Sequence, residues 1–434
     1  MKLKTIITAW MVMMLIAATS LATESENKNL TRIFDPVIVT GDQTDLDGAP
    51  IANYNLYAID ENQLKPIPFQ IDERDEDGFF VLTAGKEAST DKDNGYFDEN
   101  DELVFMAKDT GDRLTDHSIL PASYRAMAEL EIKDPLTRES GWAYLLAFDS
   151  PAQDKSTTDY VNYTPQTRML ETTYYMVGFD PAYPATPADY AFKKTLGGTG
   201  EDFLDRAKIR VMMGALGCTL HRNENDIKVK ALGYIDGPVR VVSYVHTKTP
   251  LVLGIPASST RQYTYYYQSI ADFGFAASFP LKPSKFRVTI IDDFKNAIGW
   301  TVYNSNNPEG IVIDGKMGPA DKNLNLSPWT WGVISNGTNS FWSRWQALDG
   351  CPARASLYFN DDMNAEDKYE NDPGERPGIG FDFIEGWDEL EEDRIELRLI
   401  HFFTKGYTSE LIPEVIQVHD VPLEVSGDDI TGDL

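Results

Sequence analysis

Residues 33–150 show almost no helical periodicity and instead contain short apolar segments typical of β-strands. The segment 52–59 is an example, because Tyr54, Leu56 and Ala58 alternate with more polar neighbours. A period of two places successive side chains on opposite faces of a strand, so the apolar face needs cover from a second sheet. We therefore expect an all-β fold whose N-terminal part, residues 23–150, is a small antiparallel β-sandwich.

Strand-like segments resume after residue 171. They cover residues 172–178, 209–213, 227–234, 239–246, 262–269, 286–291, 300–303 and 310–314. The intervening residues 151–170 are polar and have no strong period. We predict a linker over residues 151–170, a larger β-sandwich with few helices over residues 171–425, and a short acidic tail over residues 426–434.

The first 22 residues have the pattern of a secretory signal peptide. Lys2 and Lys4 precede an apolar run over residues 5–18, and small residues follow at 20–22. This pattern predicts cleavage before Thr23 and a periplasmic or extracellular protein. No later apolar run reaches the roughly 20 residues that span a bilayer, so we expect no transmembrane segment after cleavage.

The chain is strongly acidic, with a formal net charge of −29 and a pI near 4.5. Nucleic-acid binding requires a basic surface that neutralises phosphates, so this composition argues against a nucleic-acid partner. The content of 42% hydrophobic residues is nevertheless sufficient for a globular core.

Acidic residues are densest between the strand-like segments 66–71 and 103–107. Residues 72–112 contain fourteen carboxylates and only four basic side chains. Calcium binds six to eight oxygen ligands, and closely spaced carboxylates with turn carbonyls supply them. We predict a Ca²⁺ site formed by Asp91, Asp93, Asp98, Asp101 and Glu102. Gly95 is at the wrong position for an EF-hand, and the alternative is a solvated acidic loop without an ion.

A tryptophan-rich segment follows later in the chain. Asn336-Gly337 between two aromatic runs predicts a β-hairpin. Four of the eight tryptophans, Trp329, Trp331, Trp342 and Trp345, lie in these runs, together with Arg344. If exposed, they suit a sugar-binding surface, because indoles stack on the apolar face of a sugar ring and Arg344 can hydrogen-bond hydroxyls or a uronate carboxylate. The alternative is a core packed with indoles.

The two cysteines, Cys218 and Cys351, predict a disulfide in an oxidising compartment. The alternative is a pair of buried thiols. No C-x-x-C-H motif and no phosphate-binding glycine loop is present, so we predict neither haem nor a nucleotide cofactor.

Three sequence segments, PIPFQIDE, NGYFDENDELVFMA and DTGD, resemble those of a known group of proteins. This part, about a quarter of the chain, resembles uncharacterised secreted bacterial β-sandwich proteins and is similar to a domain of unknown function found near polysaccharide-degrading enzymes. Residues 236–242, DGPVRVV, resemble a strand of the large β-sandwiches related to mutarotases and polysaccharide lyases. The resemblance implies a connection with carbohydrates but supplies no catalytic residues.

Motifs for nucleophilic or zinc-dependent catalysis, such as G-x-S-x-G and H-E-x-x-H, are absent. Tyr244 or His246 beside Arg240 is a weak candidate for the base of a lyase, because the three residues share one strand face. We therefore favour a secreted, non-catalytic, calcium-stabilised β protein that binds an envelope carbohydrate or a protein partner. The alternative is a carbohydrate-active enzyme, either a polysaccharide lyase or a hydrolase.

Overall fold

The computed structural model describes residues 27–429, except residue 47 and residues 86–94, 182–185, 216–217, 249–258, 279–284, 349–350, 366–376 and 391–393. The predicted signal peptide therefore lies outside the described residues. Within them, no helix is long and apolar enough to cross a membrane.

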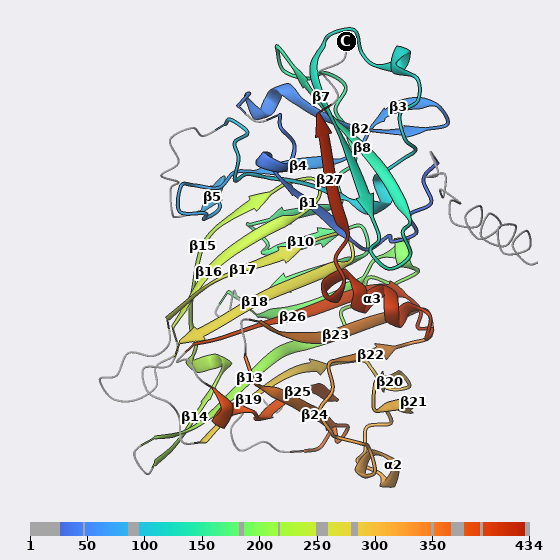
Figure 1. The fold of residues 1–434 in the computed structure, drawn as a ribbon. Helices are drawn as coiled ribbons and strands as arrows, with labels where there is room; N and C mark the ends of the chain where they lie inside the picture. Colours follow the sequence, from blue (N-terminus) through green and yellow to red (C-terminus); the bar gives the residue numbers. More distant parts are fainter. Residues whose placement is uncertain are drawn as a thin grey trace, which may run out of the picture.

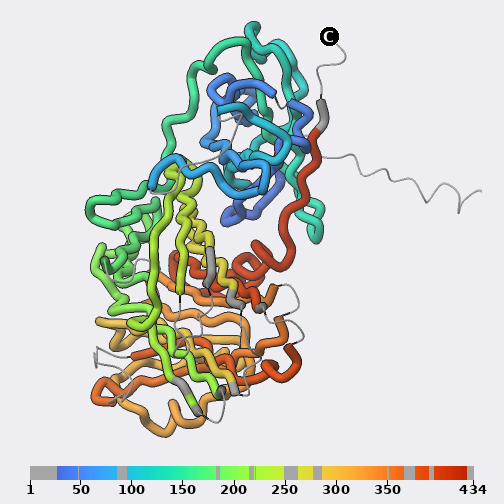
Figure 2. The backbone as a smooth tube through the Cα atoms, turned by 90° about the vertical axis from the view of Figure 1, so that its left-hand side faces the viewer, coloured from blue at the N-terminus to red at the C-terminus, as the bar shows by residue number. Residues whose placement is uncertain are grey.

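The described chain is all-β, as the alternation predicted, and its sheets are antiparallel (Figure 1). Two sandwiches follow each other along the long axis of the molecule. The side view in Figure 2 places the N-terminal sandwich at one end and the larger sandwich at the other.

The N-terminal sandwich packs a three-stranded sheet on a five-stranded sheet. The first sheet contains β1 (Pro36–Thr40), β6 (Glu102–Met106) and β4 (Phe69–Asp72) in that order. The second contains β27 (Glu424–Asp429), β7 (Tyr124–Lys133), β8 (Ser140–Phe148), β2 (Tyr54–Asp60) and β3 (Gln63–Pro66). Alternate residues such as Leu103, Phe105 and Leu145 are fully buried between the sheets.

The larger sandwich is built on a ten-stranded sheet. In sheet order its strands are β21 (Asn307–Val312), β20 (Thr301–Asn304), β22 (Trp331–Ser335), β23 (Asn339–Leu348), β26 (Arg394–Lys405), β18 (Ile270–Ser278), β17 (Ser259–Tyr266), β16 (Val241–Lys248), β15 (Lys228–Asp236) and β5 (Ala84–Gly85). Strand β5 comes from the N-terminal acidic stretch, so this stretch belongs to both sandwiches.

Two smaller sheets cover the inner face of the ten-stranded sheet. One contains β14 (Cys218–Asn223), β13 (Leu204–Ala215), β19 (Lys285–Phe294), β25 (Gly378–Glu385) and β24 (Arg354–Asn360). The other contains β12 (Pro187–Phe192), β11 (Tyr175–Phe179), β10 (Met169–Thr172) and β9 (Val161–Thr164). Apolar residues from all three sheets form one continuous core.

Helix α3 (Leu411–Asp420) lies on the outer face of the ten-stranded sheet, and the short helix α2 (Pro319–Lys322) lies between β21 and β22 in the chain. Val415 and Val418 of α3 pack with Trp342 and Phe402 of the sheet. After α3 the chain returns to the N-terminal sandwich, where β27 pairs with β7 (Figure 1).

Two predicted boundaries differ from the structure. The segment 151–170, predicted as a linker, contains β9, because Val161 and Leu170 are buried in the larger core. Residues 426–429, predicted as part of a frayed tail, belong to β27, whose backbone completes the edge of the N-terminal sheet.

Candidate functional site

The acidic stretch of the N-terminal sandwich faces the larger sandwich through its polar side chains. In β6, Leu103 and Phe105 point into the N-terminal core, whereas Val104 and Met106 pack against the larger sandwich. By the same alternation, Glu102 faces the larger sandwich. In β4, Gln70 and Asp72 also contact residues of the larger sandwich.

These side chains surround Arg240, which immediately precedes β16 and is fully buried. Arg240 Nε donates to Asp72 Oδ2 at 2.7 Å, and its Nη2 forms an ion pair with Glu102. Gln70 Oε1 accepts hydrogen bonds from the backbone N–H groups of Val239 and Arg240, each at 2.9 Å. We call Gln70, Asp72, Glu102 and Arg240 the Arg240 clamp.

The charges of the clamp depend on one another. Burial raises the pKa of Asp72, and Arg240 only partly offsets this effect. Burial also raises the pKa of Glu102, but Arg240 and Arg74 outweigh it, so the pKa lies below its usual range. Arg74 Nε donates to Glu102 at 2.9 Å. Glu102 is therefore an ionised carboxylate held by two arginines.

The structure shows why glycine occupies position 237 of the segment DGPVR. A Cβ atom at this position would lie 2.3 Å from Gln70 Oε1, which is closer than non-bonded atoms can approach. The glycine therefore allows Gln70 to reach the backbone at Val239 and Arg240.

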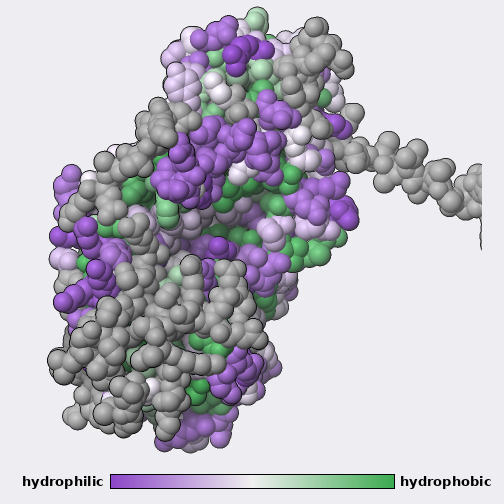
Figure 3. All heavy atoms as spheres, turned by 60° about the vertical axis from the view of Figure 1, so that its left-hand side comes forward, coloured by the Kyte–Doolittle hydropathy of each residue, from purple (hydrophilic) through white to green (hydrophobic). Residues whose placement is uncertain are grey.

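A cleft of about 290 Å³ lies beside the clamp. Its walls come from β1, β6, β17, β18, β26, the end of α3 and the segment that leads into β27. Figure 3 shows this face of the molecule hollowed between the two sandwiches, with hydrophilic and hydrophobic residues on the walls. Ligand sites occur preferentially at such junctions.

Asp272 of β18 lines the cleft, and its carboxylate contacts Arg398 and His419. Its Oδ1 lies 3.2 Å from Nε of Arg398 in β26, and its Oδ2 lies 3.3 Å from Nε2 of His419 in α3. Alternation along β18 sends Ala271 and Phe273 into the core and leaves Asp272 on the outer face.

Two further polar residues of the cleft, Asp35 and Tyr267, each contact an arginine. Asp35 accepts a hydrogen bond from Arg32 Nε at 3.1 Å, and burial raises the pKa of Asp35 despite this contact. Tyr267 accepts a hydrogen bond from Arg240 at 3.2 Å, and burial raises the pKa of Tyr267 to about 12, so its hydroxyl stays protonated. The cleft is thus lined by three acidic residues, two arginines and one histidine.

The weak catalytic candidates do not form a site together. Arg240 is occupied by the clamp. Tyr244 is buried and stacks on Tyr263, with ring centroids 4.3 Å apart. His246 lies further along β16. Arg240 lines the cleft, and Tyr244 and His246 do not.

The predicted tryptophan hairpin is present, because β22 and β23 pair around Asn336-Gly337. The expected exposed sugar-binding surface is wrong, since Trp329, Trp331, Trp342 and Trp345 are all buried. Arg344 is also buried, where it donates to the carbonyl of Ile416 and to Asp420 at the end of α3. Because α3 covers the outer face and the small sheets cover the inner one, both faces of the hairpin are core.

The structure describes only three of the five predicted calcium ligands. Asp91 and Asp93 lie outside the described residues, and no cluster of three or more metal-binding side chains occurs in the remainder. Glu102 forms ion pairs with Arg74 and Arg240, which compete with a calcium ion for its carboxylate. Asp101 accepts backbone hydrogen bonds from Arg74 and Asp98, as in an ordinary loop, and Asp98 accepts one from Asn100.

The predicted disulfide between Cys218 and Cys351 stays a prediction, because the side chain of Cys218 lies outside the described part of the chain. Cys351 is buried and packs in the larger core. Cys218 begins β14 at the edge of the five-stranded sheet, where it is paired through the backbone with Ala215. This arrangement leaves Cys351 as part of the apolar packing.

Sequence reasoning missed Asp272, Arg398 and His419. Asp272 is a single polar residue in an otherwise apolar segment, which was the available signal, whereas Arg398 and His419 have polar neighbours and carry no such signal. The three segments meet only in the folded sheet, so no spacing in the sequence connects them.

No known protein family and no curated protein sequence matches this chain. Among solved structures, an α-mannosidase from Enterococcus faecalis V583 is 10% identical, with a TM-score of 0.48 over 93% of this chain and 45% of its own. A glycosyl hydrolase family 38 protein from Enterococcus faecalis is 8% identical, with a TM-score of 0.48 over 93% of this chain and 47% of its own. The α-N-acetylgalactosaminidase NagBb from Bifidobacterium bifidum, in complex with Gal-NHAc-DNJ, is 10% identical, with a TM-score of 0.36 over 57% and 38%. This chain spans less than half the length of these three proteins. At these identities and TM-scores, the function has to be argued from the site alone.

Proposed function

We propose that the protein binds a neutral carbohydrate in the cleft between its two sandwiches. The observation that carries this proposal is the composition of the cleft walls. Carboxylates at Asp272 and Glu102 accept hydrogen bonds, the guanidinium of Arg398 donates them, and the tyrosine hydroxyls do both. A sugar ring presents hydroxyls of both kinds.

Apolar groups in the same cleft suit the C–H face of a sugar ring. Ile38, Ile270 and Leu423 line it beside the polar groups, and the side chain of Ile38 is 41% exposed. A largely apolar wall with a few fixed polar groups is the usual construction of a small-molecule site.

The charge of the cleft favours a neutral ligand over a uronate. Each arginine already has a carboxylate partner in or beside the cleft, so a second carboxylate would compete for donors and meet Asp272 and Glu102. The net charge of −29 adds a long-range repulsion for polyanions.

Binding is tested by calorimetric titration of the protein with maltohexaose, cellohexaose, mannohexaose and an oligogalacturonate. We expect at least one neutral oligosaccharide to bind and Asp272→Asn to weaken it at least tenfold, since a hydrogen bond to a charged group contributes about 1.5–3 kcal/mol. Asp60→Asn is the matched control, because Asp60 pairs with Lys65 on an exposed hairpin of the N-terminal sheet. Equal effects of the two substitutions, or binding of the uronate alone, would refute the proposal.

An acid–base enzyme acting on carbohydrates is the second candidate. It is favoured by the contact between His419 and Asp272, a pair in which the carboxylate orients the imidazole, and by the raised pKa of Asp35 in the same cleft. Chromatography of the same oligosaccharides after incubation with the protein separates the two functions. Shorter products that are absent with the His419→Gln variant would show that the protein is an enzyme. Intact oligosaccharides would show that it binds them without cleaving them.

The compartment and the ion are further parts of the proposal. The signal-like N-terminus supports a periplasmic or extracellular protein, and Asp91 and Asp93 remain proposed Ca²⁺ ligands on the strength of their spacing. An envelope protein is the other partner that the sequence leaves open.

A further inference from the structure

A second pocket lies on the opposite face of the ten-stranded sheet from the cleft. Three successive tyrosines at the end of β17 show the two faces, because Tyr265 and Tyr267 line the cleft and Tyr266 lines the second pocket. On this inner face the four-stranded sheet of β9 to β12 covers β15, β16 and β17, and the pocket lies between the two layers. We call it the inter-sheet pocket. It shares no lining residue with the cleft.

Two aromatic pairs bridge the two layers at this pocket. Tyr163 of β9 packs edge-to-face on Tyr234 of β15, with ring centroids 4.9 Å apart. Phe179 of β11 and Tyr266 of β17 form the second pair, with centroids 6.0 Å apart. Strand β10 pairs with both β9 and β11, and β16 pairs with both β15 and β17. The two aromatic pairs therefore flank the space between β10 and β16.

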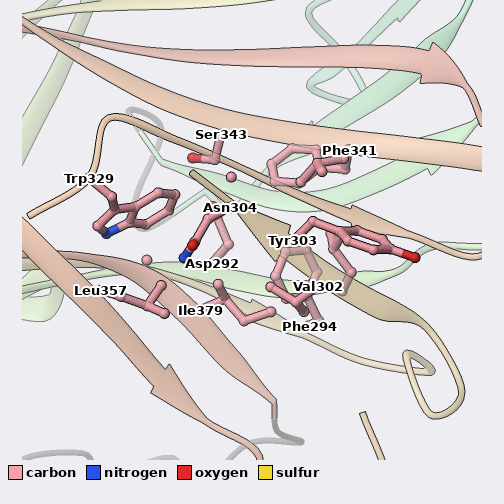
Figure 4. Close-up of a pocket in the computed structure, with 14 residues that line it drawn as sticks. Asp292, Phe294, Val302, Tyr303, Asn304, Trp329, Phe341, Ser343, Leu357 and Ile379 are labelled. Atoms are coloured by element: carbon pink, nitrogen blue, oxygen red, sulfur yellow. The ribbon is translucent and has the colours of Figure 1, made fainter. Parts of the chain in front are cut away.

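The space between the aromatic pairs has an apolar base of suitable size for one ring. Leu170 of β10 and Val241 of β16 line it, and each is only 1% exposed. Its volume is about 170 Å³, and an apolar cavity of about 150 Å³ is large enough to bind benzene. By contrast, the pocket beside Asp292 in Figure 4 has a volume of about 20 Å³, which is too small for a ring.

Polar groups of the inter-sheet pocket gather on the side of the Tyr163–Tyr234 pair. Ser243 of β16 lines the pocket directly opposite Tyr234 in the strand register. Arg168, in the turn between β9 and β10, is exposed and also lines the pocket. Burial and the neighbouring Tyr234 raise the pKa of Tyr163, and the charge of Arg168 offsets part of this rise, so Arg168 and Tyr163 lie close together.

The charge of this pocket is opposite to that of the cleft. Arg168 is the one charged side chain among its described lining residues, whereas three acidic residues line the cleft. Asp236 accepts a hydrogen bond from the backbone N–H of Tyr163 at 3.3 Å and does not line the pocket. A ligand in the inter-sheet pocket therefore meets a cation at the exposed end and apolar side chains at the buried end.

We propose that the inter-sheet pocket binds a small aromatic monocarboxylate, with its ring between the two aromatic pairs and its carboxylate at Arg168. Aromatic rings favour edge-to-face contacts with one another, and a guanidinium binds a carboxylate through two parallel hydrogen bonds. A sugar is unsuited to this pocket, because its hydroxyls would face Leu170 and Val241 without hydrogen-bond partners. The site is thus independent of the carbohydrate cleft.

Fluorine NMR of 4-fluorophenylacetate with the full chain tests this proposal. We expect binding with a dissociation constant of about 1 mM or lower, as suits a ligand of this size. The neutral 4-fluorophenylacetamide should bind about tenfold more weakly, because it lacks the charge-assisted hydrogen bonds to Arg168. Arg168→Gln should weaken binding of the acid to the level of the amide and leave the amide unchanged.

Arg138→Gln is the matched control for the substitution at Arg168. Both arginines are exposed in hairpin turns and have left-handed backbones, with φ of 66° at Arg138 and 55° at Arg168, but Arg138 lies between β7 and β8 in the other sandwich. Asp272→Asn, which alters the cleft, should leave binding of the acid unchanged. The proposal is overturned if the acid does not bind, if the acid and the amide bind equally, or if Arg168→Gln has no more effect than Arg138→Gln.

A second substitution tests the position of the ring. Ser243→Met extends a longer side chain into the inter-sheet pocket, so it should weaken binding of the acid and of the amide alike. Its melting temperature is measured alongside to establish that the variant is folded. A folded Ser243→Met protein that binds both compounds as tightly as the wild type would place the ring elsewhere and overturn the proposal.

Discussion

Arg240 connects the two sandwiches because carboxylates from two strands of the N-terminal sheet share its guanidinium. Asp72 and Glu102 lie on β4 and β6, and both contact Arg240, whose side chain is 1% exposed. A planar guanidinium serves two carboxylates at once, which the point charge of a lysine cannot do. Two carboxylates of the acidic stretch, Asp72 and Glu102, therefore bind an arginine side chain.

Replacing Arg240 should be the most destabilising change of a charged residue in the molecule. We expect Arg240→Met to lower the free energy of unfolding by about 3–5 kcal/mol, since it leaves the buried Asp72 carboxylate without a cationic partner and Glu102 with Arg74 alone. Urea denaturation of the variant measures this. Arg354→Met is the matched control: Arg354 pairs with Glu385 and Glu389 at an exposed site, where solvent screens the ion pairs and the loss should be much smaller. Similar losses in both variants would show that the clamp adds little.

Asp292 should make the protein less stable as the pH rises from about 4 to about 7. Its pKa of about 7 in the folded state exceeds its value in the unfolded chain, so the folded state binds more protons across this window. The free energy of unfolding then falls with increasing pH, by up to about 4 kcal/mol from this group. Asp101, whose pKa burial also raises to about 7, acts in the same direction. Glu102, whose pKa is lowered, acts only at more acidic pH.

Asp292→Asn isolates the contribution of Asp292. An amide of the same shape is neutral at every pH, so the variant should be more stable than the wild type at pH 8 and less dependent on pH between 4 and 7. Urea denaturation at pH 5 and pH 8 provides the comparison. A wild type that is equally stable at both values, or a variant with an unchanged slope, would contradict the assignment.

At the scale of elements, the alternation of apolar and polar residues predicts which side chains are buried when a strand has one buried face. It fails when both faces of the strand are buried. Strand β2 and the β22–β23 hairpin form where the sequence predicts them, but both faces of β2 are buried. The burial of both faces of the hairpin could not be predicted, because its outer cover is α3, about 70 residues away. An exposed and a buried indole hairpin have the same local sequence.

The C-terminal strand was missed for a similar reason. Residues 424–429 are mostly polar or acidic, and they are ordered by backbone pairing with β7, with Val425 as the one apolar side chain packed against the N-terminal core. Deleting residues 424–434 should therefore destabilise the N-terminal sandwich selectively. We expect faster hydrogen exchange in β7 and unchanged exchange in β19, which lies in the other sandwich. Equal exchange rates in β7 before and after the deletion would show that β27 is dispensable.

At the scale of the whole molecule, the fold class and the two sandwiches follow from the sequence, and the cleft does not. Asp272, Arg398 and His419 come from β18, β26 and α3, and they meet because β18 pairs with β26 and α3 crosses the outer face. Pairings between segments more than 100 residues apart are set by the packing of the whole core. A single sequence shows the strands but not their order in the sheet.

Calcium would act on the molecule as a whole through the acidic segment that contains Asp91 and Asp93. An ion at 100 times its dissociation constant adds about 2.7 kcal/mol to the free energy of unfolding, which corresponds to several degrees in melting temperature. We expect a higher melting temperature in calcium than in excess EGTA, and no difference in Asp91→Ala/Asp93→Ala. Coincident wild-type curves would show that the loop is a solvated acidic segment.

Hydrogen exchange of the full chain, with and without the neutral oligosaccharide that binds most tightly, tests the central claim most directly. If the cleft between the sandwiches is the binding site, protection should increase in β18, at the end of α3 and in residues 422–425, and it should be absent in Asp272→Asn at the same ligand concentration. Protection confined to the β22–β23 hairpin or to the β13–β14 edge, with these three segments unchanged, would contradict the account.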